Sequence, residues 1–161
     1  MSLFEVSAEW SELVVRSPAT PSTYVRLSDW VRVDEHEVAF AVEAVADGLR
    51  AQLDSVSVSV WDRAGDLTEF LDGLAGDFRG WEGERAWVTN RLVLTATFHA
   101  GGHVRLRWGL RSGMFAEDPW ECSVTTTVEA GEQMSRVASD VRSFLHQGSP
   151  QGHPRARALL A

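Results

Sequence analysis

The sequence predicts an α+β domain in which an antiparallel β-sheet of about seven strands is covered on one face by two helices. Three observations support this fold class. Several segments alternate apolar and polar residues with a period of two, as strands with one buried face do. Two segments, 67–78 and 132–145, instead repeat apolar residues at helical spacing. Each half of the chain has strands first and a helix last, so both helices are expected on one apolar face.

The first half of the chain contains four strand candidates, which predict an antiparallel meander. They are residues 13–15, 23–33, 38–44 and 55–60. Pro18 and Pro21 separate the first two candidates, because proline cannot donate a ladder hydrogen bond. In the second candidate, strict alternation places Val31 and Val33 on the same side as Val25.

A helix is predicted next, from apolar residues at i, i+3, i+4, i+7 and i+11. These are Leu67, Phe70, Leu71, Leu74 and Phe78. Asp66 can cap the helix, and Glu69 three residues later completes a pattern close to the capping box. Gly80 can end the helix in the left-handed conformation. Gly73 and Gly76 each cost about 1 kcal/mol relative to alanine, so packing has to hold this helix.

A hairpin follows, and the apolar pattern predicts its register. Residues 92–98 and 104–110 alternate on either side of a glycine-containing turn. A three-residue loop places Phe98 opposite Val104, so that apolar residues face one another along both strands. A two-residue loop would place Phe98 opposite Arg105 instead, so the three-residue loop is favoured.

The chain closes with one more strand and one more helix. The strand at 120–129 is expected to bury four residues, namely Trp120, Cys122, Val124 and Val128. The helix at 132–145 carries one apolar stripe. From Gln147 onward glycine, serine and proline prevail. We therefore expect a single domain over 1–146 and a flexible tail over 147–161.

Composition restricts the class of protein. The chain has 161 residues, 44% of them hydrophobic, and a formal net charge of −8. A negative field repels phosphate backbones, so no nucleic-acid binding is expected. No segment approaches the roughly 20 apolar residues of a membrane span, so no membrane partner is expected.

The first residues lack the features of a secretion signal, and the single Cys122 excludes an internal disulfide. We expect a cytoplasmic protein.

The most unusual stretch is 81–87, where two tryptophans enclose two carboxylates and an arginine. The residues concerned are Trp81, Glu82, Glu84, Arg85 and Trp87. Trp and Arg are frequent at the energetic centres of interfaces, and a loop between a helix and a strand often carries function. This stretch is therefore a candidate binding site. The alternative is that both tryptophans close the end of the core. Catalysis is not favoured, because no nucleophile or supporting base accompanies the carboxylates.

A second candidate surface is the sheet face that the helices leave open. It carries Arg105, Arg107 and Arg111 on one strand, which form a positive stripe in an acidic protein. The arginine fork binds carboxylates with two hydrogen bonds. The alternative is that Ser, Thr and Arg are the ordinary composition of a solvated sheet face.

No metal or cofactor is expected. His99 and His103 lie opposite each other at the end of the hairpin, with Cβ atoms ~5 Å apart. Two imidazoles could begin a zinc site, but no further ligand is supplied nearby, and a structural site needs four. The sequence also lacks the glycine-rich phosphate loops and the nucleophile elbow of common enzyme families.

Four stretches resemble Domain of Unknown Function 6228, an actinobacterial family, over residues 11–145. They are DLTEFL at 66–71, FRGWEGER at 78–85, GGHV at 101–104 and EAGEQM at 129–134. The resemblance implies no activity. The order of strands, helix, Gly-His hairpin and final helix is also similar to that of immunity proteins of the WapI type. That second likeness implies a protein that neutralises a toxin by covering its active site.

The function expected from these observations is binding of a protein partner without catalysis, with immunity as one form of it. The acidic charge suits a basic partner. The alternative is a small-molecule-binding module with a pocket between the sheet and Gly73 and Gly76. A homo-oligomer could also form through an exposed strand edge.

Overall fold

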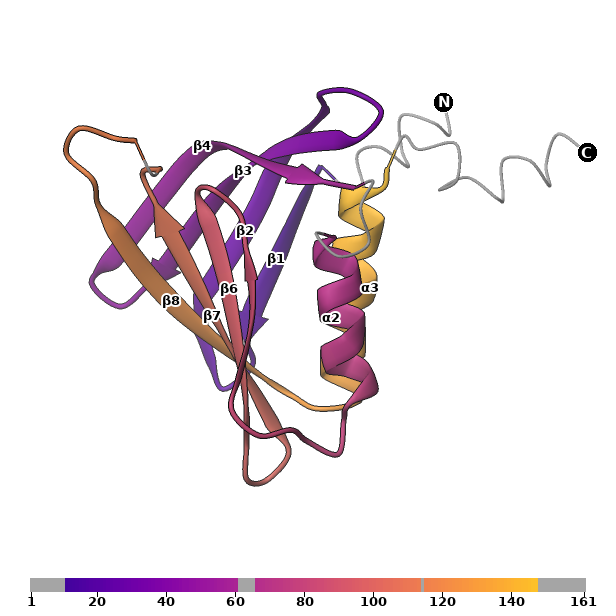
Figure 1. Cartoon of the computed structure of the whole chain (residues 1–161). Helices are drawn as coiled ribbons and strands as arrows, with labels where there is room; N and C mark the ends of the chain where they lie inside the picture. The colour runs from indigo at the N-terminus through magenta and orange to yellow at the C-terminus, as the bar shows by residue number, and fades with distance from the viewer. Residues whose placement is uncertain (1–10, 61–65, 114, 148–161) are drawn as a thin grey trace, which may run out of the picture.

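The computed structural model describes residues 11–60, 66–113 and 115–147. It confirms an α+β domain with antiparallel strands and two helices (Figure 1). The strands form two sheets of four rather than one sheet of about seven, so that part of the prediction was wrong. Residues 1–10 and almost all of the predicted tail at 147–161 lie outside the described residues.

The first sheet is the predicted meander, in the order β1-β2-β3-β4. Its strands are β1 (Glu12–Ser17), β2 (Thr20–Arg32), β3 (Glu37–Ala46) and β4 (Leu49–Ser59). The second sheet, in the order β5-β6-β7-β8, consists of β5 (Glu84–Val88), β6 (Leu92–His99), β7 (His103–Arg111) and β8 (Glu121–Glu129). Between the two sheets the chain forms α2 (Leu67–Gly76), and β4 and β5 belong to different sheets. Alternation within a strand does not show which strands are neighbours.

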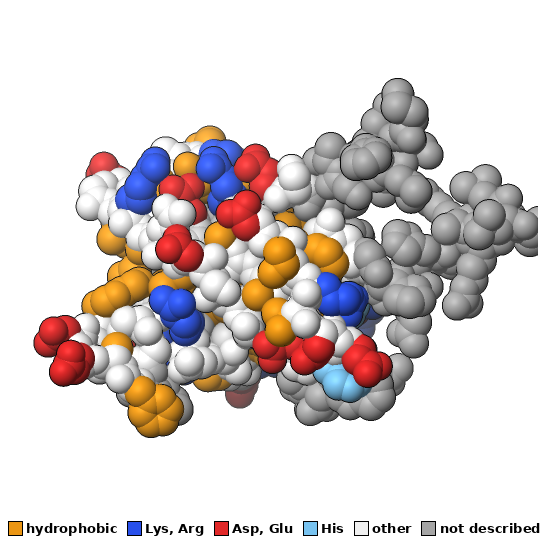
Figure 2. Space-filling view, turned by 90° about the horizontal axis from the view of Figure 1, so that it is seen from above, with side chains coloured by type: hydrophobic (Ala, Val, Ile, Leu, Met, Phe, Trp, Pro, Cys, Tyr) orange, Lys and Arg blue, Asp and Glu red, His pale blue; other side chains and the backbone are white. Residues whose placement is uncertain are grey.

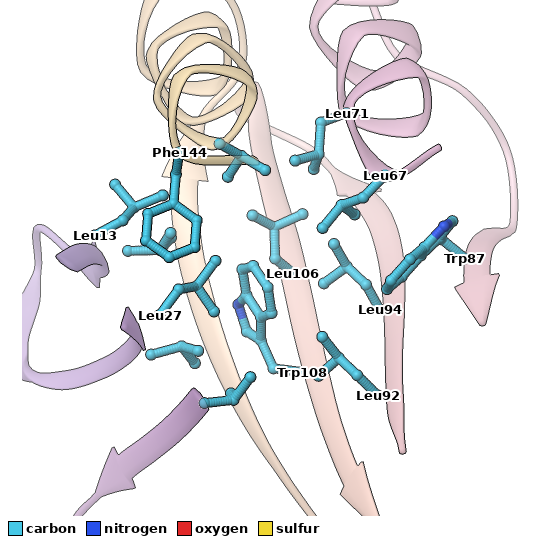
Figure 3. Packing of buried hydrophobic residues seen from close by; sticks show 14 of the residues in the cluster. Leu13, Leu27, Leu67, Leu71, Trp87, Leu92, Leu94, Leu106, Trp108 and Phe144 are labelled. Atoms are coloured by element: carbon cyan, nitrogen blue, oxygen red, sulfur yellow. The ribbon is translucent and has the colours of Figure 1, made fainter. Parts of the chain in front are cut away.

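One hydrophobic core joins both sheets to α2 and α3 (Glu132–Leu145). The two helices lie side by side against the sheets (Figure 1). Trp108 of β7 is fully buried and lies near Leu27 of β2 and Leu106, below the helices (Figure 3). Phe144 of α3 packs edge-to-face on Phe40 of β3 with ring centroids 5.8 Å apart. Burial of these large side chains is the main stabilising contribution to such a fold.

The hairpin register was predicted correctly. Phe98 pairs with Val104 and His99 with His103, and the pairing continues without irregularity to the far end of β6. Gly101 and Gly102 have φ values of 92° and 79°, which glycine adopts without steric cost and which the three-residue loop requires.

The predicted alternation of β2 is wrong beyond Ser28. Asp29 has φ 54°, and the pairing with β3 shifts register there. Such a bulge adds one residue and moves later side chains to the opposite face. Val31 and Val33 are therefore about half exposed, whereas the Trp30 indole N–H donates a 3.0 Å hydrogen bond to the Leu145 carbonyl at the end of α3.

The first helix begins as predicted and ends earlier. The Asp66 carboxylate accepts a 2.8 Å hydrogen bond from the Thr68 backbone N–H. The helix ends at Gly76, so Phe78 lies outside it and is 53% exposed. Gly80 does have φ 115°, but it shapes the turn beyond the helix. A Cβ at Gly80 would come within 2.9 Å of the Phe98 ring.

Gly73 and Gly76 are on the exposed side of α2, which corrects the predicted pocket between helix and sheet. A Cβ at either glycine would meet nothing within 4 Å. We expect Gly73→Ala to raise the free energy of unfolding by about 0.5–1 kcal/mol, because alanine has the better helix propensity. Chemical denaturation measures this. Gly80→Ala is the control and should be destabilising; a destabilised Gly73→Ala would contradict the assigned exposure.

Asp66 also faces His146 after the end of α3, with 3.6 Å between the Oδ2 and Nε2 atoms. Burial alone would raise the pKa of the Asp66 carboxyl, but the nearby His146 imidazole and the hydrogen bonds from Thr68 outweigh burial and lower that pKa from its ordinary value. A carboxyl with a lowered pKa stabilises the fold above its unfolded-state pKa, and this contribution is lost as the pH falls through the folded-state pKa.

We therefore expect Asp66→Asn to unfold more easily than the wild type at pH 6, with the difference shrinking below about pH 4. Asparagine keeps the helix cap and removes the charge. Urea unfolding at several pH values measures the difference in free energy. A gap that stays constant from pH 6 to pH 3 would show that the charge of Asp66 does not contribute.

Candidate functional site

The predicted arginines lie on the outer face of the β5–β8 sheet. The pairing places Glu84 of β5, Thr97 of β6, Arg105 of β7 and Thr127 of β8 in one row across the sheet. In β6, β7 and β8 the neighbouring residues point to the core instead. We call the outer face, defined by Arg105, Arg107 and Arg111, the arginine face.

A hollow of about 500 Å³ lies on the arginine face. It is lined by Val93, Thr95, Arg107, Gly109, Leu110, Arg111, Glu121, Cys122 and Ser123. Gly109 lies between Val93 and Ser123 in the pairing, without any bulge. A glycine inside a regular strand weakens it and often marks a place where another molecule approaches closely. A Cβ there would make ordinary contacts of 3.5–3.6 Å with Val93, so a side chain can be added at this position without a clash of its Cβ.

The three arginines differ in what they contact. Arg105 is exposed and has no ion-pair partner among the residues that the structure describes. Arg107 is also exposed, and its Nη2 atom is 3.8 Å from Glu84 Oε2. An exposed pair at that distance contributes little to stability. Arg105 and Arg107 can therefore exchange solvent for a ligand carboxylate or phosphate.

Arg111 is already engaged by the protein. Its Nε and Nη2 atoms donate 2.7 and 2.8 Å hydrogen bonds to the carbonyls of Asn90 and Thr89. The same turn reaches the other sheet, since Thr89 Oγ1 and Arg91 Nη1 donate to carbonyls of β4. Arg111 therefore positions the turn between β5 and β6, and its role at the rim of the hollow is secondary.

The candidate stretch 81–87 does not form one patch. Trp87 is only 6% exposed and belongs to the core, as the alternative interpretation expected (Figure 3). Trp81 packs against the Phe98 ring at 5.4 Å, and the Arg85 guanidinium lies over Trp81 at 4.7 Å. Residues 84–88 are a strand rather than a loop.

The carboxylates of this stretch have separate surroundings. Glu84 lies on the arginine face near Arg107, whereas Glu82 is exposed in the turn before β5. Arg85 points the other way and forms a 2.6 Å ion pair with Asp77 after α2. Of the stretch, Glu84 alone joins the predicted arginines.

Two exposed aromatic residues were not predicted. Phe115 is 93% exposed and Trp120 is 42% exposed, although Trp120 was expected on the buried side of its strand. Both lie in the loop between Arg111 and Glu121. These two end residues line the hollow. Trp120 is held by two 3.0 Å hydrogen bonds between its backbone and Ser112. The available sequence signal was a large aromatic residue in a stretch interrupted by Gly113 and Pro119.

The hollow has little capacity for nucleophilic chemistry. Burial raises the pKa of the Cys122 thiol, which lowers the fraction of reactive thiolate at neutral pH. Within residues 11–60, 66–113 and 115–147, no group of three or more His, Cys, Asp or Glu side chains is arranged to hold a metal ion. The arrangement can form charge-assisted hydrogen bonds and apolar contacts.

Charge does not segregate at the end of the molecule seen in Figure 2. Acidic and basic side chains intermingle there, and hydrophobic side chains gather between them. Among the described helices, none combines the length and hydrophobicity needed to cross a bilayer.

A protein-family model matches most of the chain. A family model described as "Family of unknown function (DUF6228)" matches residues 16–148, which is most of the chain. No curated protein matches the sequence. The matched region contains the end of β1, all of β2 to β8, both helices and the whole arginine face. The chain therefore belongs to the family of unknown function DUF6228.

Proposed function

We propose that this protein binds a protein partner, without catalysis, through the arginine face and the adjoining loop with Phe115 and Trp120. One observation carries the proposal. The hollow over Gly109 is bordered by the exposed Arg107, and the loop that joins two of its lining residues exposes both aromatic side chains. Arginine and aromatic residues around a pocket are the usual composition of an interface centre.

The contact chemistry indicates the kind of partner segment. Arg107, at the border of the hollow, favours a carboxylate, and the aromatic side chains favour an apolar residue next to it. The net charge of −8 would speed the approach of a partner that is basic elsewhere. Immunity against a basic toxin is one form of this proposal, supported by the acidic charge. A cytoplasmic location is part of the same proposal.

Filling the hollow tests the proposal. Gly109→Leu should leave the fold intact, since a Cβ there makes only ordinary contacts, and should reduce partner capture by about tenfold or more. Tagged wild-type and variant proteins are compared by quantitative mass spectrometry of what each captures from the host lysate. Gln52→Leu adds the same side chain to an exposed position of the other sheet, and it is the matched control.

The proposal predicts at least one protein that is captured by the wild type and by Gln52→Leu but is not captured by Gly109→Leu. Equal capture by all three proteins would show that the hollow is not the binding site. Circular dichroism of each variant verifies that the fold is unchanged.

Small-molecule binding is the second candidate function, and the volume of the hollow favours it. About 500 Å³ lies within the range of ligand sites. Its position differs from the predicted one, since it lies on the outer face of the sheet rather than against α2. A metabolite that raises the melting temperature of the wild type and not of Gly109→Leu would support this function.

A further inference from the structure

A second hollow, of about 360 Å³, lies at the other end of the arginine face. It is bordered by the hairpin turn of β6 and β7 on one side and by the turn between β1 and β2 on the other. The two walls are joined by a 2.8 Å hydrogen bond from the Thr127 backbone N–H to the Ser17 hydroxyl. This bond connects β8, at the edge of one sheet, to the end of β1 in the other sheet.

The polar lining of this hollow consists of hydrogen-bond donors and contains no carboxylate. The residues are Arg105, His99, His103, Ser17, Thr20 and Thr127. Glu129 is the residue paired with His103 on β8, but it does not line the hollow. This lining therefore carries no negative charge, in a protein with 23 acidic and 15 basic residues. It favours an anion.

Several of these donors are available to a ligand. Arg105 has no ion-pair partner among the described residues, so its five N–H groups are free for an oxyanion. Ser17 accepts the Thr127 N–H, which leaves its own O–H to donate. The Thr97 hydroxyl is 2.8 Å from His99 Nε2. A neutral His99 that accepts this bond carries its proton on Nδ1, which is then a further donor.

We propose that this hollow binds the phosphate group of a small phosphorylated molecule. Arginine binds phosphate with two parallel hydrogen bonds. The surrounding hydroxyl and imidazole groups supply further donors, so the site has more hydrogen-bond donors than the two oxygens of a carboxylate can accept. Ala19 and Ala100 supply an apolar part of the lining, against which the organic group of the ligand packs. This site is separate from the hollow over Gly109 and does not depend on the proposed protein partner.

Amide NMR titration of the ¹⁵N-labelled protein tests the proposal with three probes at constant ionic strength: inorganic phosphate, phenyl phosphate and acetate. Phenyl phosphate should shift the amides of Ala19, Ala100 and Thr127 in a saturable way and bind more tightly than inorganic phosphate. Acetate should bind at least about tenfold more weakly. Arg105→Gln should weaken phenyl phosphate binding by about tenfold or more. Arg107→Gln, on the same strand and outside this hollow, should change it by less than about twofold.

His103→Gln provides a second variant and should also weaken binding, since His103 is exposed and its replacement leaves the core intact. Shifts that do not saturate, equal affinity for acetate, or full affinity in both Arg105→Gln and His103→Gln would overturn the proposal. No protein partner takes part in the titration, so its outcome is independent of the capture experiment.

Discussion

Replacing Phe115 and Trp120 together by alanine is expected to weaken partner binding by about 100-fold or more. Each aromatic residue at an interface centre is worth about 2 kcal/mol, which is roughly 30-fold, and two neighbours are not strictly additive. Phe115 is 93% exposed and makes little contribution to the core. The two hydrogen bonds between Trp120 and Ser112 involve only the backbone of Trp120, so alanine retains them.

The free energy of unfolding should therefore change by less than about 1 kcal/mol in this double variant. Binding of the captured partner is measured by calorimetry, and stability by chemical denaturation. Phe78→Ala is the matched control, because Phe78 is a 53% exposed aromatic residue beyond α2 and away from the arginine face. An equal loss of binding in the control, or no loss of binding in the double variant, would show that the loop is not part of the interface.

Trp108→Ala is expected to lower the free energy of unfolding by about 3–5 kcal/mol. Trp108 is fully buried in the core that joins both sheets to the helices. Its indole N–H donates a 3.0 Å hydrogen bond to the Thr126 hydroxyl, which is itself fully buried on β8. The substitution leaves a large cavity and an unpaired hydroxyl. Many small domains are stable by only 5–15 kcal/mol, so the loss is a large part of the total.

Thr126→Val separates the hydrogen bond from the packing. Valine has nearly the same shape, so this variant leaves the Trp108 N–H buried without an acceptor and should cost about 1–3 kcal/mol. In the Trp108→Ala background, Thr126→Val should cost much less, because the N–H is then absent. Urea denaturation of the four proteins gives the coupling free energy. Additive effects would contradict a contribution from this hydrogen bond.

The elements that depend on local pattern were predictable from the sequence. The hairpin register followed from the alternation around Phe98 and Val104, and the start of α2 followed from the cap at Asp66. In both cases residues close in sequence decide the geometry. The division into two sheets was not predictable, because it depends on which strands pair after α2, and alternation within a strand does not identify its neighbour.

The bulge at Asp29 shows why alternation can fail. A single residue with positive φ moves Trp30 inward and Val31 outward, and the hydrogen bond from Trp30 to α3 accompanies that change. Leu145 is 115 positions away from Trp30 in the sequence, so no local sequence pattern could predict this hydrogen bond.

The candidate site was predictable in part. Arg105 and Arg107 were expected on an open sheet face, and they are there. That Glu84 belongs to the same face follows from the pairing of β5 with β6, which the sequence did not indicate. The hollow over Gly109 could not be predicted from the sequence either, because its walls come from three strands.

Site-specific photo-crosslinking tests the central claim most directly. A benzoylphenylalanine at Ser123, which is exposed and lines the hollow, is irradiated in host lysate, beside the same group at the exposed Asp54 of β4. The proposed function predicts a discrete protein adduct from position 123, lost when Gly109→Leu is added, and no such adduct from position 54. The same adducts from both positions, or none from position 123, would contradict a protein-binding role for the arginine face.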